Sequence, residues 1–405
     1  MIHCLHRKYK CFYFADTLFW RYLMKVAVLG FGTVGQGVYE MLQHANGLEP
    51  GPVLVRPGKD DAPFKVTDIE AVTGDPAVDA VVEVLGGTEP ARSWTEAALR
   101  AGKHVVTANK ALVAAHGPEL AAVAREQGVA FLFSAACGGG VPFLHNLALA
   151  AQSDRILSVG GILNGTTNYM LDAMQSRGAD YAAVLKDAQA LGYAEADPSS
   201  DVSGLDALRK IMLACAVAFE KLPTEGLYTE GIEDLTPADV QSFRQMDLTC
   251  RLVARGGIGP RGAVFAFVEP TLVPASAAEC AVKDNYNLAR YEAERAGDIV
   301  LMGQGAGRFP TASAVLRDLS DVLCGQRVMM PAGCVRVTAD GEGCGHPYYV
   351  RLPAELTGQL PVDRIQKDGD TARVVTSSVT VKWMHDTAAR LRAQGAKLFF
   401  AGIEG

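Results

Sequence analysis

A short stretch near the middle of the chain, residues 192–210, combines acidic side chains with a lysine. Its ionisable residues include Glu195, Asp197, Asp201, Asp206 and Lys210. Asp206 and Lys210 are four residues apart in a predicted helix and therefore share one face. An exposed ion pair worth a few tenths of a kcal/mol is the simplest interpretation. The acids that precede the pair favour a different one, a site for a substrate that carries an ammonium and a hydroxyl group.

A glycine-rich turn near the start of the chain is a second candidate site. The apolar run 26–29 predicts a buried parallel strand, and a helical pattern with one apolar face follows it. Between them lies G-x-G-x-x-G, whose glycines permit a tight turn and close approach of the backbone to a pyrophosphate. A glycine turn of structural use only is the alternative. The candidate cofactor-binding residues here are Gly30, Phe31, Gly32, Thr33, Val34 and Gly35.

The next predicted strand, 53–55, bears on which nicotinamide cofactor is bound. Sites that prefer NAD place an acid at the end of this strand to hold the ribose 2′-hydroxyl. Here Arg56 stands at that position and Lys59 follows. Two cations suit a 2′-phosphate, so the sequence favours NADP over NAD. Two exposed loop charges are the alternative, and an arginine stacked under adenine would also tolerate NAD.

Strands and helices alternate through the rest of this half. We expect strands at 80–85, 104–107 and 129–133, with helices at 91–101 and 111–127. Such alternation predicts a doubly wound parallel sheet, and ligands of such sheets bind beyond the carboxyl ends of the strands. Glu83, Asn109 and Lys110 stand at such ends.

The pattern changes after Phe133. A glycine turn with the sequence SAACGGGVP, starting at Ser134, opens a helix near 142–152. A strand at 156–163 then runs into NGTTN at 164–168, and another helix follows. This mixture predicts an α+β unit. In the tail, strand patterns at 348–352 and 372–381 precede a helix at 383–394 and a last strand at 397–402.

Composition excludes several classes of protein. The chain has 405 residues, of which 49% are hydrophobic and 20% charged, with a net charge of -7, so it is neither disordered nor basic enough to suggest nucleic-acid binding. No run of 18 apolar residues suggests a membrane span. Nine scattered cysteines without a C-x-x-C pair indicate thiols in a reducing compartment, hence the cytoplasm. We expect residues 1–23 to be a non-native or disordered extension, because a clean strand starts at Met24.

Six motifs in order make the sequence resemble the homoserine dehydrogenases over about residues 24–320. They are GFGTVG, VVEVLGG, VVTANKAL, NGTTNYML, GYAEADPSSDVSGLDALRK and GQGAGRFPTASAV. The resemblance implies NAD(P)-dependent interconversion of L-homoserine and L-aspartate 4-semialdehyde, a step of threonine, methionine and isoleucine biosynthesis. It also implies a homodimer, or a dimer of dimers, built through the catalytic half.

The resemblance assigns roles to individual residues. Lys210 and Lys110 match the two lysines to which the family's proton transfer has been assigned, and Lys110 also lies at the nicotinamide end. Glu195 matches the residue that binds the substrate ammonium. Asp201 and Asp206 match the acids that orient the substrate and the catalytic lysine. Gly307 matches a cofactor contact in a returning glycine turn. Some relatives hold a sodium ion on backbone carbonyls, and the matching residues here are Ser134, Cys137, Gly139 and Val141.

These observations give an α/β fold class with a Rossmann-type sheet, an α+β catalytic and dimerisation domain, and a small C-terminal module. The expected ranges are 24–134 for the NAD(P)-binding domain, completed by about 301–320, then 135–300, then 345–405. The tail resembles an ACT domain that lacks most of its first helix and its Asp-x-x-Gly ligand turn. We therefore expect the module to serve packing or assembly rather than inhibition by threonine.

Two other functions compete with this assignment. A thiol-dependent semialdehyde dehydrogenase would use Cys137 as the nucleophile with a histidine base, for which His145 is the nearby candidate. A non-catalytic NADP-binding sensor would have lost the lysine or the carboxylates, all of which this sequence retains. An enzyme that acts on a small molecule, without nucleic-acid or membrane partners, is the favoured prediction.

Overall fold

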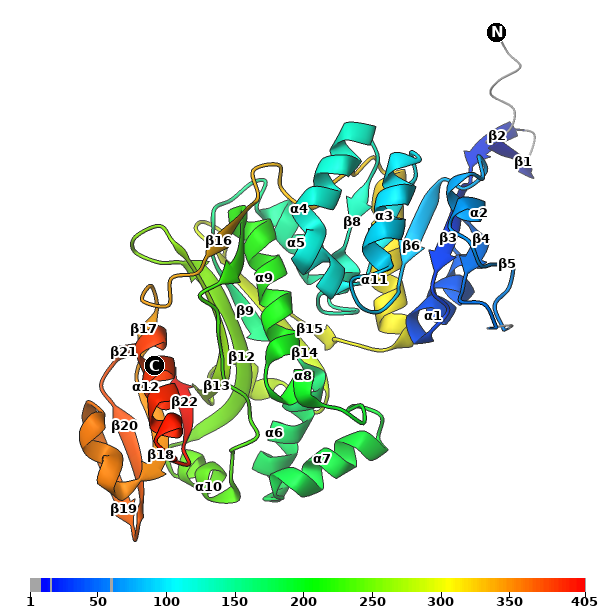
Figure 1. The fold of residues 1–405 in the computed structure, drawn as a ribbon. Helices are drawn as coiled ribbons and strands as arrows, with labels where there is room; N and C mark the ends of the chain where they lie inside the picture. Colours follow the sequence, from blue (N-terminus) through cyan, green and yellow to red (C-terminus); the bar gives the residue numbers. More distant parts are fainter. Residues whose placement is uncertain (1–8, 15–16, 59–60, 405) are drawn as a thin grey trace. The chain divides into compact units, whose positions relative to one another are not determined.

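The computed structural model describes residues 9–14, 17–58 and 61–404, and these fall into two compact units (Figure 1). One unit comprises the chain up to Pro142 together with Ala306–Ala332. The other comprises Phe143–Gly305 and the chain from Gly333 onward. Among the described residues, no helix is long and apolar enough to cross a membrane. The late segment Ala306–Ala332 thus belongs to the first unit, although it follows most of the second unit in the sequence.

The first unit contains a six-stranded sheet in which every paired strand is parallel. Its strands are β3 (Met24–Leu29), β4 (Leu48–Leu54), β5 (Lys65–Val66), β6 (Ala80–Glu83), β7 (His104–Thr107) and β8 (Phe131–Leu132). They lie in the order β5-β4-β3-β6-β7-β8, so the winding direction reverses between β3 and β6. Dinucleotides bind at such a switch point, beyond the carboxyl ends of the strands. The predicted Rossmann-type sheet is confirmed.

Helices cover this sheet. The helices α1 (Thr33–Leu42) and α11 (Arg308–Leu323) pack against each other and share one apolar core with the strands. The helices α3 (Ala91–Arg100) and α4 (Lys110–Gln127) contact each other and the strands β6 to β8, and the single-turn α2 (Glu70–Thr73) contacts α3. The inner strands β3, β6 and β7 are mostly apolar and buried because they lie in the interior of this layered unit.

The strand β4 begins well before the predicted 53–55. Two prolines, Pro50 and Pro52, and Gly51 argued against a strand there. The structure accommodates them because β5 pairs only with Val53 and Leu54, so the earlier residues of β4 pair on one side alone. A proline is tolerated where its missing N–H would face away from a ladder.

Ahead of this sheet in the sequence, β1 (Tyr9–Phe14) and β2 (Thr17–Tyr22) form a separate antiparallel pair.

The second unit is organised by one long sheet of ten strands. Along it lie β15 (Gly297–Gln304), β14 (Tyr286–Ala293), β9 (Ile156–Ile162), β12 (Leu248–Ile258), β13 (Val264–Pro274), β22 (Phe399–Ile403), β18 (Tyr348–Pro353), β20 (Thr371–Thr376) and β19 (Val362–Asp368). The short β11 (Tyr228–Thr229) pairs with β13. Two minor pairs join β10 (Lys221–Glu225) to β16 (Val335–Thr338) and β17 (Gly345–His346) to β21 (Val379–Thr380).

The central helix of this unit is α9 (Leu205–Phe219), which packs on β9, β12 and β13 and contacts α5 (Phe143–Ala150). The other helices are α6 (Gly165–Arg177), α7 (Tyr181–Ala190), α8 (Ser199–Val202) and α10 (Pro237–Gln245), with a 3-10 turn η2 (Ala278–Ala281). The helix α6 contacts α7, α8, β12 and β14. The acidic stretch thus spans α8 and the start of α9, beside the first turn of α6.

The C-terminal module adds four strands, β18, β19, β20 and β22, to the same sheet, and it contributes one helix. In chain order its strands lie fourth, first, third, second, the order of ferredoxin-like βαββαβ folds. The helix α12 (Val381–Ala393) packs on them, whereas the position of the first helix holds only a 3-10 helix, η3 (Ala354–Gln359), without a buried residue. The expected loss of the first helix is what the structure shows, and the relation to ACT domains stays a prediction.

A buried carboxylate links this module to β13 of the ten-stranded sheet. Glu269 of β13 is fully buried and bonds to His346 Nε2 at 2.7 Å and to His385 Nε2 at 3.1 Å. The hydroxyl of Tyr348 also donates to it. Burial opposes ionisation of Glu269, but the two histidines outweigh it and lower the pKa to about 2. Burial likewise opposes the charge on His346, yet its bonds to Cys344 and Glu269 raise the pKa to about 9.

This linkage predicts a stability that declines at alkaline pH. The pKa of His346 lies above its unfolded value of 6.5, so its contribution is complete below pH 6.5 and is lost as the pH rises through about 9. The substitution His346→Gln should lower the free energy of unfolding by about 3 kcal/mol at pH 6.5. It should also flatten the decline of the melting temperature between pH 6.5 and 9, followed by circular dichroism. An equal decline in variant and wild type would contradict this account.

Candidate active site

The glycine turn after β3 has the geometry that a pyrophosphate needs. Gly30 has φ +102°, and a Cβ added to it would lie 3.0 Å from the carbonyl oxygen of Val84. A Cβ on Gly35 would lie 2.2 Å from the carbonyl oxygen of Gly30, so this glycine allows α1 to approach the strand. A Cβ on Gly32 would meet nothing within 4 Å, and Gly32 caps α1 without a side-chain bond. The turn therefore offers open space in front of uncapped helix N–H groups.

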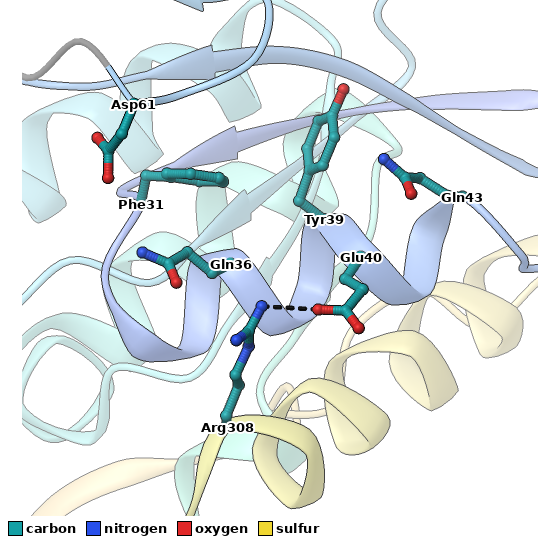
Figure 2. Close-up of a pocket in the computed structure, with 7 residues that line it drawn as sticks. All are labelled: Phe31, Gln36, Tyr39, Glu40, Gln43, Asp61 and Arg308. Carbon is teal, nitrogen blue, oxygen red and sulfur yellow. Dashed lines mark hydrogen bonds and ion pairs between the residues drawn. The ribbon is translucent and has the colours of Figure 1, made fainter.

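The other residues of the turn surround this opening. Thr33 is exposed, Val34 is half-buried, and the ring of Phe31 contacts the Tyr39 ring edge-on at 6.1 Å. Figure 2 shows Phe31 at one end of a pocket along α1, with Arg308 of α11 at its other side. Arg308 forms an ion pair of 2.7 Å with Glu40 across this pocket. The pocket is lined by Phe31, Gln36, Tyr39, Glu40, Gln43, Asp61 and Arg308.

Arg56 is exposed and lies two residues after the end of β4, with Val55 between them. It stands where an acid would hold a ribose 2′-hydroxyl, as the sequence predicts. Lys59, its predicted companion, lies outside the described residues. In the described part of this loop, Arg56 is thus the residue that carries the predicted preference for NADP, which stays a prediction.

Polar residues at the ends of β6 and β7 hold the start of α4 in place. Glu83 is fully buried and accepts hydrogen bonds from the Thr107 hydroxyl, the Leu85 N–H and the Asn109 amide. Burial raises the pKa of Glu83, and these bonds oppose the rise. Asn109 also caps α4 by accepting from Leu112 N–H at 3.1 Å. Glu83 is thus occupied by internal bonds, and together with Asn109 it fixes Lys110, the half-buried first residue of α4.

The returning helix α11 begins at the predicted cofactor contact and carries an acid that the sequence analysis missed. Gly307 caps α11 with φ +118°, a conformation that favours glycine. Asp318 is fully buried and accepts from the Ser134 backbone N–H and hydroxyl. Burial raises its pKa to about 7, against the effect of these bonds. In the sequence, Asp318 is marked only by its place as an acid on the apolar stripe of α11 that includes Val315 and Val322.

The predicted sodium residues lie in the turn that starts at this bond. Ser134 carbonyl accepts from Cys137 N–H at 3.2 Å, and Gly139 has φ +51°. Cys137 and Val141 are buried. Among the described residues, no cluster of three or more His, Cys, Asp or Glu side chains could hold a metal ion. Any cation here would therefore depend on backbone oxygens.

In the second unit, α9 and the end of β9 bring two of the predicted catalytic residues, Asp206 and Lys210, next to the carbonyl of Leu163. Lys210 Nζ lies 2.7 Å from Asp206 Oδ2, with 11% and 10% of the two side chains exposed. The same Nζ donates to the carbonyl of Leu163 at 2.6 Å. The interpretation of Asp206 and Lys210 as an exposed helix ion pair is wrong, because α9 turns this face inward. A lysine held in a nearly dry site can act as an acid in its ammonium form, or as a base in its amine form, when a reacting oxygen comes within reach.

Asn164 completes this cluster, and the sequence analysis assigned it no role. It caps α6, and its Nδ2 donates to Asp201 Oδ1 at 2.7 Å and to Asp206 Oδ2 at 2.9 Å. The signal was an asparagine directly before a helix, a position that favours capping residues. The cluster thus consists of Leu163, Asn164, Asp201, Asp206 and Lys210.

Glu195 lies on the exposed loop that precedes α8. Its backbone carbonyl accepts from the Gln189 side chain at 3.2 Å. The loop is tied to the start of α6, since the Thr166 hydroxyl donates to the Tyr193 carbonyl and the rings of Tyr169 and Tyr193 meet edge-on at 5.1 Å. The described hydrogen bonds and ion pairs therefore join Asp201, Asp206 and Lys210, and they place Glu195 on a neighbouring exposed loop.

Comparison with known proteins identifies both units. Residues 30–134 match the family model for the homoserine dehydrogenase NAD-binding domain, and residues 142–320 match the model for homoserine dehydrogenase. A homoserine dehydrogenase of Synechocystis sp. is 39% identical over 317 residues, which cover 74% of this chain and 73% of the relative. One from Corynebacterium glutamicum is 43% identical over 319 residues, or 73% and 70% of the two chains.

Solved structures agree. The crystal structure of a homoserine dehydrogenase from Thiobacillus denitrificans superposes with a TM-score of 0.84 at 31% identity, covering 94% of this chain and 98% of that one. A Staphylococcus aureus homoserine dehydrogenase gives a TM-score of 0.73 at 29% identity, with 94% and 99% covered. The chain therefore belongs to the homoserine dehydrogenase family, NAD(P)-dependent oxidoreductases that interconvert L-homoserine and L-aspartate 4-semialdehyde in threonine and methionine biosynthesis.

Proposed function

We propose that Lys210, held by Asp206, transfers the proton in the interconversion of L-homoserine and L-aspartate 4-semialdehyde. The observation that carries the proposal is the buried pair, with Nζ 2.7 Å from Asp206 and 2.6 Å from the Leu163 carbonyl. The nicotinamide cofactor supplies the hydride chemistry when bound. In reduction, Lys210 Nζ gives a proton to the oxygen of the aldehyde as it becomes a hydroxyl. In oxidation, Nζ takes that proton back.

The remaining predicted residues bind substrate and support proton transfer. Glu195, on its exposed loop, binds the ammonium group of homoserine, and Asp201 orients the substrate from the first turn of α8. Lys110 begins α4 at the carboxyl end of the nucleotide-binding sheet, so it serves the nicotinamide end and is the second candidate for proton transfer. We favour Lys210 as the proton carrier on the strength of its own buried contacts with Asp206 and the Leu163 carbonyl.

For the cofactor, we propose NADP in preference to NAD. The turn from Gly30 to Gly35 receives the pyrophosphate at the N-terminus of α1, and Gly307 offers a second uncapped helix start. Arg56 supplies the positive charge that a 2′-phosphate requires at the end of β4. The absence of an acid directly after Val55 supports the same preference.

A sodium ion on the turn at Ser134, Cys137, Gly139 and Val141 is a further proposal. A carbonyl oxygen has two lone pairs, so the bond from Cys137 N–H leaves the Ser134 oxygen able to accept a second contact. A backbone cation site requires several carbonyls to converge on one point, and a turn with left-handed residues such as Gly138 and Gly139 permits such a departure from regular strand or helix geometry. The residues fit such an ion, whose effect would be to stiffen this turn.

Neither competing function is favoured. Cys137 is fully buried, which is unsuited to a nucleophile that must meet an aldehyde. A sensor would have no need of a buried lysine with two placed carboxylates.

For assembly and location, we propose a homodimer, or a dimer of dimers, through the catalytic half, in the cytoplasm.

Replacing the proposed proton carrier should abolish turnover without unfolding the chain. Lys210→Ala should lower kcat for NADP-dependent oxidation of L-homoserine, measured at 340 nm, by about 10²- to 10⁴-fold. NADPH binding, followed by its fluorescence, should persist. Lys283→Ala is the matched control, because Lys283 is an exposed lysine of the same unit that pairs with Asp172. Near-normal turnover by the Lys210 variant would refute this role.

Removing the cation after β4 should shift the cofactor preference. Arg56→Ala should raise the KM for NADP about tenfold, because a charge-assisted contact to a phosphate is worth about 1.5–3 kcal/mol. The KM for NAD should stay within about twofold. Arg100→Ala, which removes an exposed arginine paired with Glu96 on α3, controls for lost surface charge. Equal changes in both cofactor constants would show that Arg56 does not contact the 2′-phosphate.

Threonine should not inhibit this enzyme at sub-millimolar concentration. The module lacks a first helix, since η3 contributes no buried residue, and β22 of the module pairs directly with β13 of the catalytic sheet. These features suit packing better than ligand binding. Initial rates with and without L-threonine test the point, and half-maximal inhibition below about 1 mM, an affinity of about 4 kcal/mol, would overturn it.

A further inference from the structure

We propose that Asn164 is a positioning residue for proton transfer, which it supports by holding Asp206 and Asp201 in place beside Lys210. The inference rests on the function proposed above for Lys210. Asn164 is 4% exposed, and its side chain bonds to Thr167 of α6, Asp201 of α8 and Asp206 of α9. It acts through other residues and is not assigned a contact with substrate.

The side-chain amide works in two directions. Its Oδ1 accepts from the backbone N–H of Thr167 at 2.9 Å and so caps α6. Its Nδ2 donates to Asp201 at 2.7 Å and to Asp206 at 2.9 Å. These partners fix the orientation of the amide, because carboxylates accept only and a backbone N–H donates only. One neutral group thereby links two carboxylates whose charges would otherwise repel.

No other small side chain does the same work. An aspartate in place of Asn164 would cap the helix equally well but could donate to neither carboxylate. A serine would cap the helix and could donate only once. Asparagine alone among the good capping residues combines one acceptor with two donors at this length.

Asn164 also stands behind both partners of the lysine. Asp206 Oδ2 accepts from Asn164 Nδ2 and from Lys210 Nζ, so the amide limits rotation of the carboxylate that holds the ammonium. The other partner, the carbonyl of Leu163, belongs to the residue directly before Asn164. Capping of α6 by Asn164 therefore also fixes the peptide that presents this carbonyl. The side chain of Asn164 therefore helps to fix the position of Lys210 Nζ in two ways, through Asp206 and through the Leu163 carbonyl.

The decisive variant is Asn164→Asp, which keeps the cap and shape but replaces two donors with a negative charge. A third carboxylate beside Asp206 favours the ammonium form of Lys210. We therefore expect the rise of kcat/KM for homoserine oxidation with pH to move up by about one pH unit. At pH 7.5, kcat should fall by about tenfold, one pKa unit's worth of the reactive amine form, or more. The KM for NADP should stay within about twofold, because the cofactor turn is built from other residues.

Two further variants separate positioning from folding. Asn164→Ser keeps the cap without the added charge, so kcat should fall while the pH midpoint does not rise. Asp180→Asn is the matched control, since Asp180 is the exposed cap of α7, where its side chain accepts from Ala183 N–H at 2.8 Å. It exchanges a carboxylate and an amide at a helix cap outside the cluster and should leave the pH profile unchanged.

The outcomes distinguish this proposal from the one on which it rests. An unchanged pH midpoint in Asn164→Asp, whether kcat is normal or reduced together with the melting temperature, would overturn the positioning role. Full activity of Lys210→Ala, or no homoserine oxidation by the wild type, would instead overturn the proposed function.

Discussion

The catalytic half is organised around a lysine ammonium group that is almost removed from water. Burying such a charge without partners costs several kcal/mol, so the fold must supply compensating groups at fixed positions. Asp206 supplies the counter-charge one helical turn away on α9, and the junction of β9 and α6 supplies the Leu163 carbonyl. Asn164 in turn holds Asp206. Two segments that are distant in sequence, α9 and the junction of β9 and α6, must therefore meet before the lysine is held in place.

The nucleotide-binding half depends instead on the close approach of one backbone segment to another. Gly30 and Gly35 let strand and helix come close, and Gly32 leaves the ligand space that a side chain would fill. In the same unit, buried acids hold neighbouring segments together through hydrogen bonds. Glu83 bonds to Asn109 at the start of α4, and Asp318 of α11 bonds to Ser134. The C-terminal module uses the same device, since Glu269 links it to β13 through two histidines. Buried carboxylates thus join segments in both described units.

The sequence predicted those features that depend on local pattern. The parallel strands, the glycine fingerprint and the order of strands and helices are visible as apolar runs between glycines, and the structure confirms the sheet that they imply. The start of β4 was missed because its prolines are tolerated only through one-sided pairing. The burial of Lys210, the bonds of Asn164 and the role of Asp318 depend on which helix face turns inward and on what lies opposite. Spacing along one helix does not contain that information.

The most direct test of the central claim is a crystal structure with L-homoserine and NADP bound. We expect the substrate hydroxyl to lie within hydrogen-bond distance of Lys210 Nζ, about 2.6–3.2 Å, with Asp206 and Asn164 still in contact behind it. A hydroxyl bonded to Lys110 alone, with Lys210 remote from the substrate, would contradict the account and transfer the proton chemistry to the nucleotide-binding half.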